Sequence, residues 1–282
     1  DDMDPTKGIS EEARRRMESG VYYVAGIDSG STSTDVVILD QDGKIKSTMI
    51  IPTGGGAMMS AEKSLEKAVE KAGISKDDIV RIVTTGYGRA YINSGDDSIT
   101  EITCHAKGAH YLNPNVRTVI DIGGQDIKAI SIDENGAVKN FLMNDKCAAG
   151  TGRFLEMMAK TLGLSLEEMS VKGLEWKHNI VISSMCTVFA ESEVISLIGQ
   201  GEKKENIAFA VVDSIVRKVA AQANRMSEDR SMLCLTGGLC ECSYISEALT
   251  KELGMEVKTD PQSRYAGAIG AALGAVKKGK KN

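Results

Sequence analysis

The chain has 282 residues, of which 42% are hydrophobic and 26% charged, a composition typical of a globular protein with room for two domains. Its formal net charge of −5 argues against nucleic acid as a partner, because a nucleic-acid footprint needs a basic face. No apolar run reaches the roughly 18 to 20 residues of a membrane span, and the charged segment 1–20 lacks the apolar centre of a signal peptide. We therefore expect a cytoplasmic protein, without membrane attachment, in which residues 1–20 form an N-terminal extension.

The first predicted elements form a hairpin pattern that occurs twice. Residues 27–43 read as a strand, a glycine-rich turn, a second strand and an Asp-Gly turn, and residues 120–136 repeat this order with Asn-Gly. The repeat offset of 93 residues places Asp28 on Asp121. Asp-Gly and Asn-Gly favour tight hairpins because both central residues accept positive φ. The repeat predicts two similar α/β lobes whose turns face each other across a cleft.

Lobe I is expected to span residues 21–114. After its hairpin, the pattern predicts a helix at 57–72, a strand at 79–84 and a second helix near 100–111. Asn113-Pro114-Asn115 marks the boundary between the lobes.

Lobe II is expected to span residues 115–262. Beyond its hairpin, the predicted elements are helix-like runs at 153–160 and 188–195, an amphipathic helix at 206–226 and a strand at 232–236. A helix of small residues at 266–277 is expected to pack back on lobe I, so that residues 263–282 complete that lobe.

Glycine-rich turns at three strand ends are candidates for phosphate binding, since free backbone N–H groups and hydroxyls make an anion cradle. The candidates are Asp28, Gly30, Ser31, Thr32, Ser33 and Thr34 at the first turn, Asp121, Gly123, Gly124 and Gln125 at the second, and Gly237 and Gly238 at the third. The aspartates can hold Mg²⁺, commonly through water, and Gln125 can orient an attacking water. The chain has neither a G-x-x-x-x-G-K-[ST] loop nor a complete dinucleotide fingerprint.

Two cysteines stand where a strand or loop gives way to a helix-like run: Cys147 in Asp145-Lys146-Cys147-Ala148, and Cys186 in Ser184-Met185-Cys186-Thr187. A helix N-terminus stabilises a thiolate or an anionic cluster. An iron–sulfur cluster normally takes four thiolates, so a symmetric homodimer could share one cluster across its two-fold axis. Spacing alone also permits the alternative that both are buried structural thiols.

These residues resemble the ATP-dependent activators of 2-hydroxyacyl-CoA dehydratases, in the BadF/BadG/BcrA/BcrD ATPase family of the acetate/sugar kinase–Hsp70–actin superfamily. The resemblance runs from Val24 to Val276 and is most specific in the segments 85–89, 120–126, 141–154 and 186–196. It implies a two-lobed ATPase with duplicated ribonuclease H-like lobes.

The resemblance also implies the cofactors and partners. One [4Fe–4S] cluster per homodimer would be held by Cys147 and Cys186, ATP or ADP with Mg²⁺ would bind the first two turns, and adenosine would contact Gly237-Gly238. Reduced ferredoxin or flavodoxin would be the electron donor. The acceptor would be an iron–sulfur enzyme: a 2-hydroxyacyl-CoA dehydratase, a benzoyl-CoA reductase or a double-cubane cluster protein. The expected activity is ATP hydrolysis coupled to one-electron transfer.

The chain departs from the family pattern in two places: Asp35 stands where members often carry Lys, and 239–242 reads Leu-Cys-Glu-Cys in place of a small-basic-Asn run. Cys240 and Cys242 are expected to be ordinary thiols near the nucleotide pocket. Glu101 and His105 are four residues apart on a predicted helix and could pair, without an evident chemical role. Two other readings stay open: a small-molecule kinase of the same superfamily, and a nucleotide-gated binding module without redox chemistry.

Overall fold

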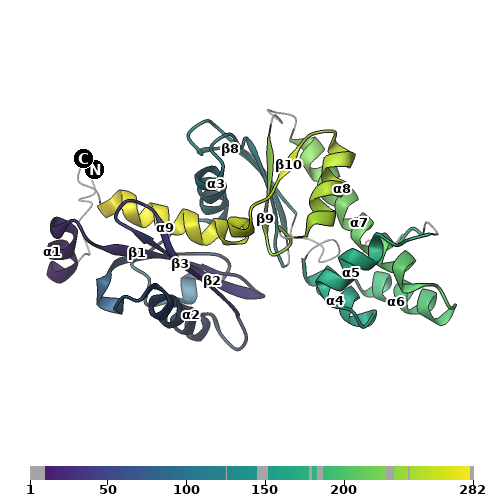
Figure 1. The fold of residues 1–282 in the computed structure, drawn as a ribbon, viewed down its shortest axis with the longest axis horizontal. Coiled ribbons are helices and arrows are strands. Elements are labelled where there is room, and N and C mark those ends of the chain that lie inside the picture. The colour runs from purple at the N-terminus through teal and green to yellow at the C-terminus, as the bar shows by residue number, and fades with distance from the viewer. Residues whose placement is uncertain are drawn as a thin grey trace. The chain divides into compact units, whose positions relative to one another are not determined.

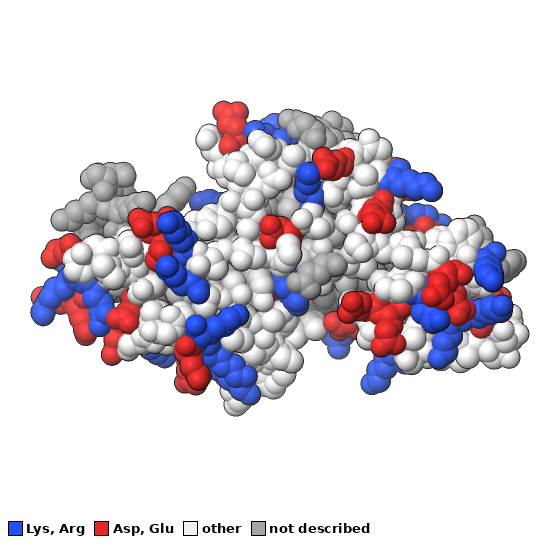
Figure 2. Space-filling view, viewed as in Figure 1, with Lys and Arg blue, Asp and Glu red and all other residues white. Residues whose placement is uncertain are grey.

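The computed structural model describes residues 10–124, 126–144, 152–177, 180–182, 187–226, 232–240 and 242–279. Contacts divide the chain into two compact units: unit 1 comprises Asp1–Pro114 and Tyr265–Asn282, and unit 2 comprises Asn115–Arg264. Among the described residues, no helix has both the length and the apolar character needed to cross a membrane. On the face drawn in Figure 2, acidic and basic side chains alternate without a field of one sign.

Unit 1 is built on a five-stranded sheet with the order β3-β2-β1-β4-β5. β1 pairs antiparallel with β2 and parallel with β4, and β2 pairs antiparallel with β3. The strands are β1 (Tyr23–Ser29), β2 (Ser33–Asp40), β3 (Ile45–Pro52), β4 (Ile79–Thr85) and β5 (Asp97–Ser98). The helices are α1 (Glu11–Ser19), α2 (Ala57–Ala72), α3 (Glu101–Leu112) and α9 (Ala266–Gly279).

Helices cover both faces of this sheet, with α2 and α9 on opposite sides (Figure 1). Successive strand residues point to opposite faces, so Ala25 and Ile27 pack in the cluster that contains α2, whereas Val24 packs in the cluster that contains α9. Small residues bring α9 close to α3, because a Cβ on Gly270 would overlap the Cys104 carbonyl oxygen. This packing fixes α3 beside the ends of β1 and β4.

The helices of unit 1 lie where the sequence predicts them. The helix at 57–72 has the predicted bounds, and those predicted at 100–111 and 266–277 are observed as α3 and α9. Helix α1 in the N-terminal extension was not predicted. The Ser10 hydroxyl caps it by accepting a hydrogen bond from Ala13 N at 3.1 Å, and Arg16 pairs with Asp78, which anchors the helix beside β4.

Unit 2 is built on a second five-stranded sheet, with the order β10-β9-β6-β7-β8. The strands are β6 (Thr118–Ile122), β7 (Ile127–Ile132), β8 (Val138–Asn144), β9 (Leu233–Gly237) and β10 (Val257–Lys258). The helices are α4 (Gly152–Thr161), α5 (Leu166–Gly173), α6 (Thr187–Gly199), α7 (Lys204–Arg225) and α8 (Ser243–Leu253). One apolar cluster joins the sheet to these helices, which gather around α7 (Figure 1).

The two sheets share one topology. Each begins with three antiparallel strands, β1–β3 in unit 1 and β6–β8 in unit 2. A parallel strand, β4 or β9, pairs with the first of these, and a short strand, β5 or β10, pairs with that one. Asp28 pairs in register with Asp35 on β2, and Asp121 pairs with Lys128 on β7. The duplication predicted from the sequence is therefore confirmed at the level of strand order and register.

Candidate nucleotide-binding site

The first candidate turn joins β1 to β2 and is held by Thr53, which follows β3. Gly30 N donates to Ser33 O at 2.9 Å and closes the turn. Thr53 Oγ1 donates to Gly30 O at 2.7 Å, and Thr53 N donates to Thr32 O at 3.0 Å. Thr34 is buried, with its hydroxyl 3.0 Å from the Thr53 hydroxyl. Thr34, predicted as a ligand-binding residue, thus supports the turn from within, and the part played by Thr53 was not predicted from the sequence.

The other hydroxyl residues of this turn differ in exposure. Ser31 and Thr32 are exposed, whereas Ser33 is half-buried. The turn therefore presents two hydroxyl side chains to solvent, whereas the Gly30 N–H is used to close the turn.

Asp28 is the penultimate residue of β1 and lies in a confined position. Its side chain is 14% exposed, and its register partner on β4 is Thr85. His105 Nε2, from α3, lies 3.7 Å from Asp28 Oδ2. Gly86 has a φ of 93°, and a Cβ there would lie 2.6 Å from Asp28 Oδ1. Glycine at 86 therefore permits both the left-handed conformation and the close approach of backbone to carboxylate.

Cys104 lies next to His105 on α3 and is fully buried. Burial raises the pKa of its thiol to about 12, a hydrogen bond with Thr85 acts in the opposite direction, and the charge of Asp28 adds to the rise. The thiol is therefore neutral at physiological pH and packs as a small apolar group.

The second candidate turn joins β6 to β7. Gly123 N donates to Asp126 O at 2.9 Å, which mirrors the Gly30–Ser33 contact of unit 1. Lys128 Nζ lies 2.7 Å from Asp126 Oδ1 and 3.7 Å from Asp121 Oδ2. Thr236 Oγ1 donates to Asp121 Oδ1 at 2.9 Å. Asp121 is thus held by a lysine across the hairpin and by a hydroxyl of the neighbouring parallel strand.

The second turn also contacts the start of α4. Gly152 N donates to Gly123 O at 2.9 Å, and Arg153 N donates to Gly124 O at 3.2 Å. The first two backbone N–H groups of the helix therefore bind the carbonyl oxygens of the turn, which ties the position of the helix end to the conformation of the turn.

The third candidate turn follows β9. Gly237 also has a φ of 93°, and a Cβ there would lie 2.5 Å from Ile122 O and 2.9 Å from Asp121 Oδ1. Gly86 stands in the same relation to Ser29 and Asp28 in unit 1. A Cβ on Gly238 would meet no atom of the described residues within 4 Å.

Three residues of the predicted site, Gln125, Cys147 and Cys186, lie outside the described residues. Their neighbours are placed: Gly124 and Asp126 flank Gln125, β8 ends three residues before Cys147, and α6 begins directly after Cys186. Cys240 is buried with its Sγ 3.8 Å from Asp260 O, and Cys242 Sγ lies 3.0 Å from Ser170 Oγ, so both follow the third turn into the interior of unit 2.

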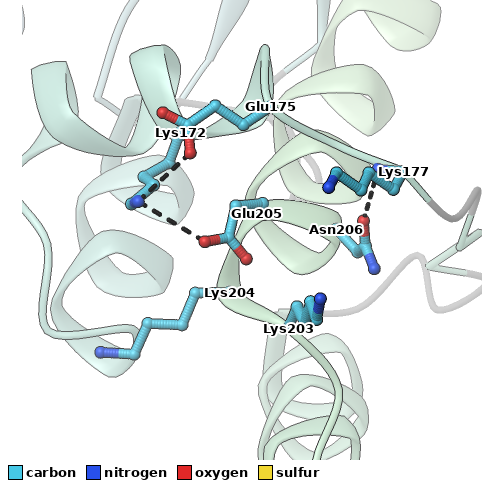
Figure 3. A pocket seen from close by; sticks show the side chains of 7 residues that line it. All are labelled: Lys172, Glu175, Lys177, Lys203, Lys204, Glu205 and Asn206. Atoms are coloured by element: carbon cyan, nitrogen blue, oxygen red, sulfur yellow. Dashed lines mark hydrogen bonds and ion pairs between the residues drawn. The ribbon is translucent and has the colours of Figure 1, made fainter.

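Unit 2 also carries a separate pocket of about 590 Å³ where α5 meets the start of α7 (Figure 3). Two of its carboxylates pair with one lysine: Lys172 Nζ lies 3.3 Å from Glu175 Oε2 and 3.5 Å from Glu205 Oε1. Asn206 Oδ1 accepts from Lys177 N at 2.9 Å. None of the lining residues belongs to a phosphate turn, so the pocket is distinct from the candidate site.

Comparison with known proteins places this geometry among ATPases. The model of the BadF/BadG/BcrA/BcrD ATPase family matches residues 25–275. The (R)-2-hydroxyglutaryl-CoA dehydratase activating ATPase of Acidaminococcus fermentans is 42% identical over 92% of this chain and 99% of that protein. The 2-hydroxyisocaproyl-CoA dehydratase activator of Clostridioides difficile is 40% identical over 92% and 97%. A component polypeptide of the benzoyl-CoA reductase of Thauera aromatica is 34% identical over 76% and 77%.

Solved structures give the same picture of the fold. Component A of the A. fermentans dehydratase superposes with a TM-score of 0.86 at 41% identity, covering 92% of this chain and all of that one. The C. difficile activator with bound ADPNP gives 0.86 at 39% identity, covering 92% and 98%. A ROK family glucokinase from Streptomyces griseus, at 16% identity and a TM-score of 0.55 over 90% and 99%, shares the fold alone. The fold is that of the actin, Hsp70 and sugar-kinase ATPases, as the sequence predicts.

Proposed function

Because the chain belongs to the BadF/BadG/BcrA/BcrD ATPase family, we propose that it is an ATP-hydrolysing iron–sulfur activator that passes a low-potential electron to a partner iron–sulfur enzyme such as a 2-hydroxyacyl-CoA dehydratase. The observation that carries this proposal is the full-length similarity to two dehydratase activators, at 40% and 42% identity over 92% of the chain. The duplicated aspartate turns supply the matching nucleotide chemistry.

ATP with Mg²⁺ is proposed to bind at the aspartate turns of both units. Asp28 and Asp121 offer the hard oxygen donors that Mg²⁺ prefers, with phosphate and water completing its six positions. Gly86 and Gly237 fit such a group, because a Cβ at either position would lie within 3 Å of the carboxylate beside it. The backbone N–H groups of the turns and the hydroxyls of Ser31 and Thr32 would bind phosphate oxygens. Gln125 would orient the attacking water.

Cys147 and Cys186 are proposed to hold a [4Fe–4S] cluster that is shared with a second copy of the chain. Two thiolates per chain are half of a four-thiolate set, so a homodimer completes it. When bound, the cluster would supply one-electron chemistry at low potential. Reduced ferredoxin or flavodoxin is the proposed donor.

Exposed apolar side chains next to the two cysteine segments support a homodimer. On β8, Phe141 and Met143 are both 47% exposed, two residues apart and so on one face of the strand. On α6, Phe189 and Ile195 are 67% and 54% exposed. A second copy covering these residues would bring its own cysteine segments to the same place.

The contacts between the second turn and α4 offer a route from nucleotide to cluster. Gly123 O and Gly124 O accept hydrogen bonds from the first two N–H groups of α4, and Cys147 lies five residues before Gly152 in the chain. A phosphate that changes the conformation of this turn would shift the N-terminus of the helix. We propose that this movement changes the backbone environment of the Cys147 thiolate, and with it the reducing power available to the partner.

Anaerobic purification with iron and sulfide quantified per protein tests the proposal. We expect about four irons per dimer, and loss of iron in the Cys147→Ser and Cys186→Ser variants, with ATP binding retained. Cys242→Ser is the matched control, because this half-buried thiol precedes α8 and belongs to neither cysteine segment. A colourless monomer that binds ATP would instead favour a non-redox nucleotide-binding module.

A second acceptor class is supported by the similarity to the benzoyl-CoA reductase polypeptide, which covers 76% of the chain at 34% identity. The two readings differ only in the partner enzyme. Incubating the reduced protein and ATP with a purified 2-hydroxyacyl-CoA dehydratase, and separately with a benzoyl-CoA reductase core lacking its ATPase components, distinguishes them. The acceptor whose activity appears in an ATP-dependent manner identifies the class.

A further inference from the structure

The segment Glu101–Gly108, for which the sequence offers no chemical role, forms the first two turns of α3, and its His105 faces Asp28 near the end of β1. The segment also packs closely against the start of α9, because a Cβ on Gly108 would overlap the backbone carbonyl of Ala266. The helix is therefore fixed between α9 and the end of β1, in a position to orient whatever it contacts there.

His105 is the residue of this segment that faces Asp28. Nε2 lies 3.7 Å from Asp28 Oδ2, and the two side chains are 6% and 14% exposed. A Cβ on Gly267 would overlap Asp28 Oδ2 and lie 2.9 Å from His105 Nε2, so the start of α9 closes over the pair. The carboxylate is thus confined by Gly86 on its Oδ1 side and by His105 and Gly267 on its Oδ2 side.

Glu101, one helical turn earlier, faces Arg89. Glu101 Oε1 lies 3.7 Å from Arg89 Nη1, and the same nitrogen donates to Gly86 O at 2.9 Å. Gly88 N donates to Ser29 O at 3.0 Å, which joins this turn to the end of β1. Glu101 therefore orients the arginine that holds the Gly86 turn beside Asp28.

The equivalent aspartate of unit 2 is held differently. Asp121 has Lys128 as its register partner, with Nζ 3.7 Å from Oδ2, whereas Asp28 has Asp35 at that position. A carboxylate this far from solvent needs polar or cationic partners to offset its desolvation. In unit 1, the nitrogen beside Asp28 Oδ2 belongs to His105 on α3, whereas in unit 2 it belongs to a lysine on the facing strand.

We propose that His105 is a positioning residue: it fixes the Asp28 carboxylate in the orientation that binds Mg²⁺–nucleotide, while Glu101 and Arg89 hold the adjacent turn. This inference rests on the proposed function in one respect, that Asp28 acts on Mg²⁺–nucleotide. Residues that orient a metal-binding group typically contribute a factor of about 10 to 100 in metal affinity.

Titration calorimetry of ADP with and without Mg²⁺ tests the role of His105 without using the reaction. We expect His105→Asn, whose amide is too short to reach Asp28, to weaken Mg²⁺–ADP binding by about 10- to 100-fold and to leave metal-free ADP binding within about twofold of the wild type. His105→Gln, with a longer reach, should recover most of the loss. His110→Gln on the same helix is the matched control and should behave as the wild type.

The Asp28→Asn background separates this inference from the proposed function. If His105 acts through Asp28, the loss caused by His105→Asn disappears in that background, because coupled residues are not additive. Unchanged Mg²⁺–ADP binding in Asp28→Asn alone would overturn the role of Asp28 and thus the proposed site. Two results would overturn the positioning role alone, provided that Asp28→Asn weakens Mg²⁺–ADP binding. One is unchanged Mg²⁺–ADP binding in His105→Asn. The other is a loss from His105→Asn that is as large in the Asp28→Asn background as in the wild type. Should His105→Asn not fold, Glu101→Gln, at a partly exposed position, must weaken Mg²⁺–ADP binding more than metal-free binding for the inference to stand.

Discussion

Lys128 Nζ lies 2.7 Å from Asp126 Oδ1, within the hairpin that carries the second phosphate turn. The lysine side chain is only 4% exposed, and it also faces Asp121, which is equally buried. One cation therefore compensates two carboxylates, and the conformation of the turn depends on it. The same hairpin in unit 1 has no lysine at the equivalent position, where Asp35 stands.

Replacing Lys128 with Met is expected to destabilise unit 2 by about 3 to 5 kcal/mol, because it removes the cation that faces the buried Asp121 carboxylate. Lys128→Arg keeps the charge and should lose less. Urea unfolding monitored by circular dichroism measures the effect. Lys46→Met is the control: Lys46 is 45% exposed and 3.6 Å from Asp40, so its loss should cost no more than about 1 kcal/mol. Equal losses in the two variants would contradict the prediction.

Gly86→Ala and Gly237→Ala are expected to impair nucleotide binding as well as stability. Each residue has a φ of 93°, and a Cβ on either would lie 2.5 Å from a backbone carbonyl oxygen of the neighbouring strand. The turn must therefore move away from its aspartate, in addition to the roughly 1 to 2 kcal/mol cost of the left-handed conformation. Gly43→Ala isolates that cost, since Gly43 has a φ of 80° with nothing within 4 Å. Gly43→Ala should lower the melting temperature slightly and leave ATP hydrolysis unchanged, whereas Gly86→Ala and Gly237→Ala should lose most of their ATP hydrolysis.

The stability of unit 1 is expected to fall at alkaline pH because of Cys104. Burial raises the pKa of this thiol from 9.0 to about 12. As the pH rises, the thiol therefore loses its proton in the unfolded state before it does so in the folded state. The contribution is complete below pH 9 and is lost as the pH rises toward 12, by about 1.4 kcal/mol per pH unit. Wild type and Cys104→Ala should therefore converge in unfolding free energy between pH 9 and 11. A constant difference across that range would contradict the assignment.

The duplicated hairpin could be predicted because its signals are local, whereas the places of the fourth and fifth strand in each sheet were not predicted. Asp42-Gly43 and Asn135-Gly136 mark the tight turns, and both glycines have positive φ; the positive φ expected for the residue before each glycine is not observed, since among the described residues glycines alone have it. The contact between Lys128 and Asp121 follows from the same local signal, because the two residues are equally spaced from the turn of one hairpin and so pair in register. Helix α8 was missed because its start, at Ser243, has no capping side chain to mark it.

The pairing of His105 with Asp28 could not be predicted from the sequence. The two residues are far apart in the chain, and the contact depends on how α3 packs against α9 through Gly108 and Gly270. The i,i+4 spacing of Glu101 and His105 suggested a local pair, whereas His105 faces Asp28 on β1 and Glu101 faces Arg89, which follows β4. The roles of Gln125, Cys147 and Cys186 stay predictions, because they depend on residues outside the described ranges.

Dimerisation is expected to depend on Phe189, which is 67% exposed on α6 and three residues from Cys186. Phe189→Asp would place a charge among apolar residues that a second copy is proposed to cover, so the variant should run as a monomer in size-exclusion chromatography with light scattering and should lose its iron. Val171→Asp on α5, where the valine is 56% exposed, is the control and should remain dimeric. An iron-containing dimer of Phe189→Asp would place the interface elsewhere.

Asp35→Lys tests the proposal that Asp28 binds Mg²⁺ at the first turn. A lysine at 35 stands opposite Asp28 as Lys128 stands opposite Asp121, so its ammonium would compete with Mg²⁺ for the carboxylate and also attract phosphate. We expect metal-free ADP to bind more tightly, by roughly fivefold for an interaction of about 1 kcal/mol, and Mg²⁺ to improve that affinity less than in the wild type. Asp35→Asn removes the charge without adding one, so it should change metal-free binding less than Asp35→Lys does. If calorimetry finds the Mg²⁺ effect unchanged in Asp35→Lys, the proposal that Asp28 binds the metal is wrong.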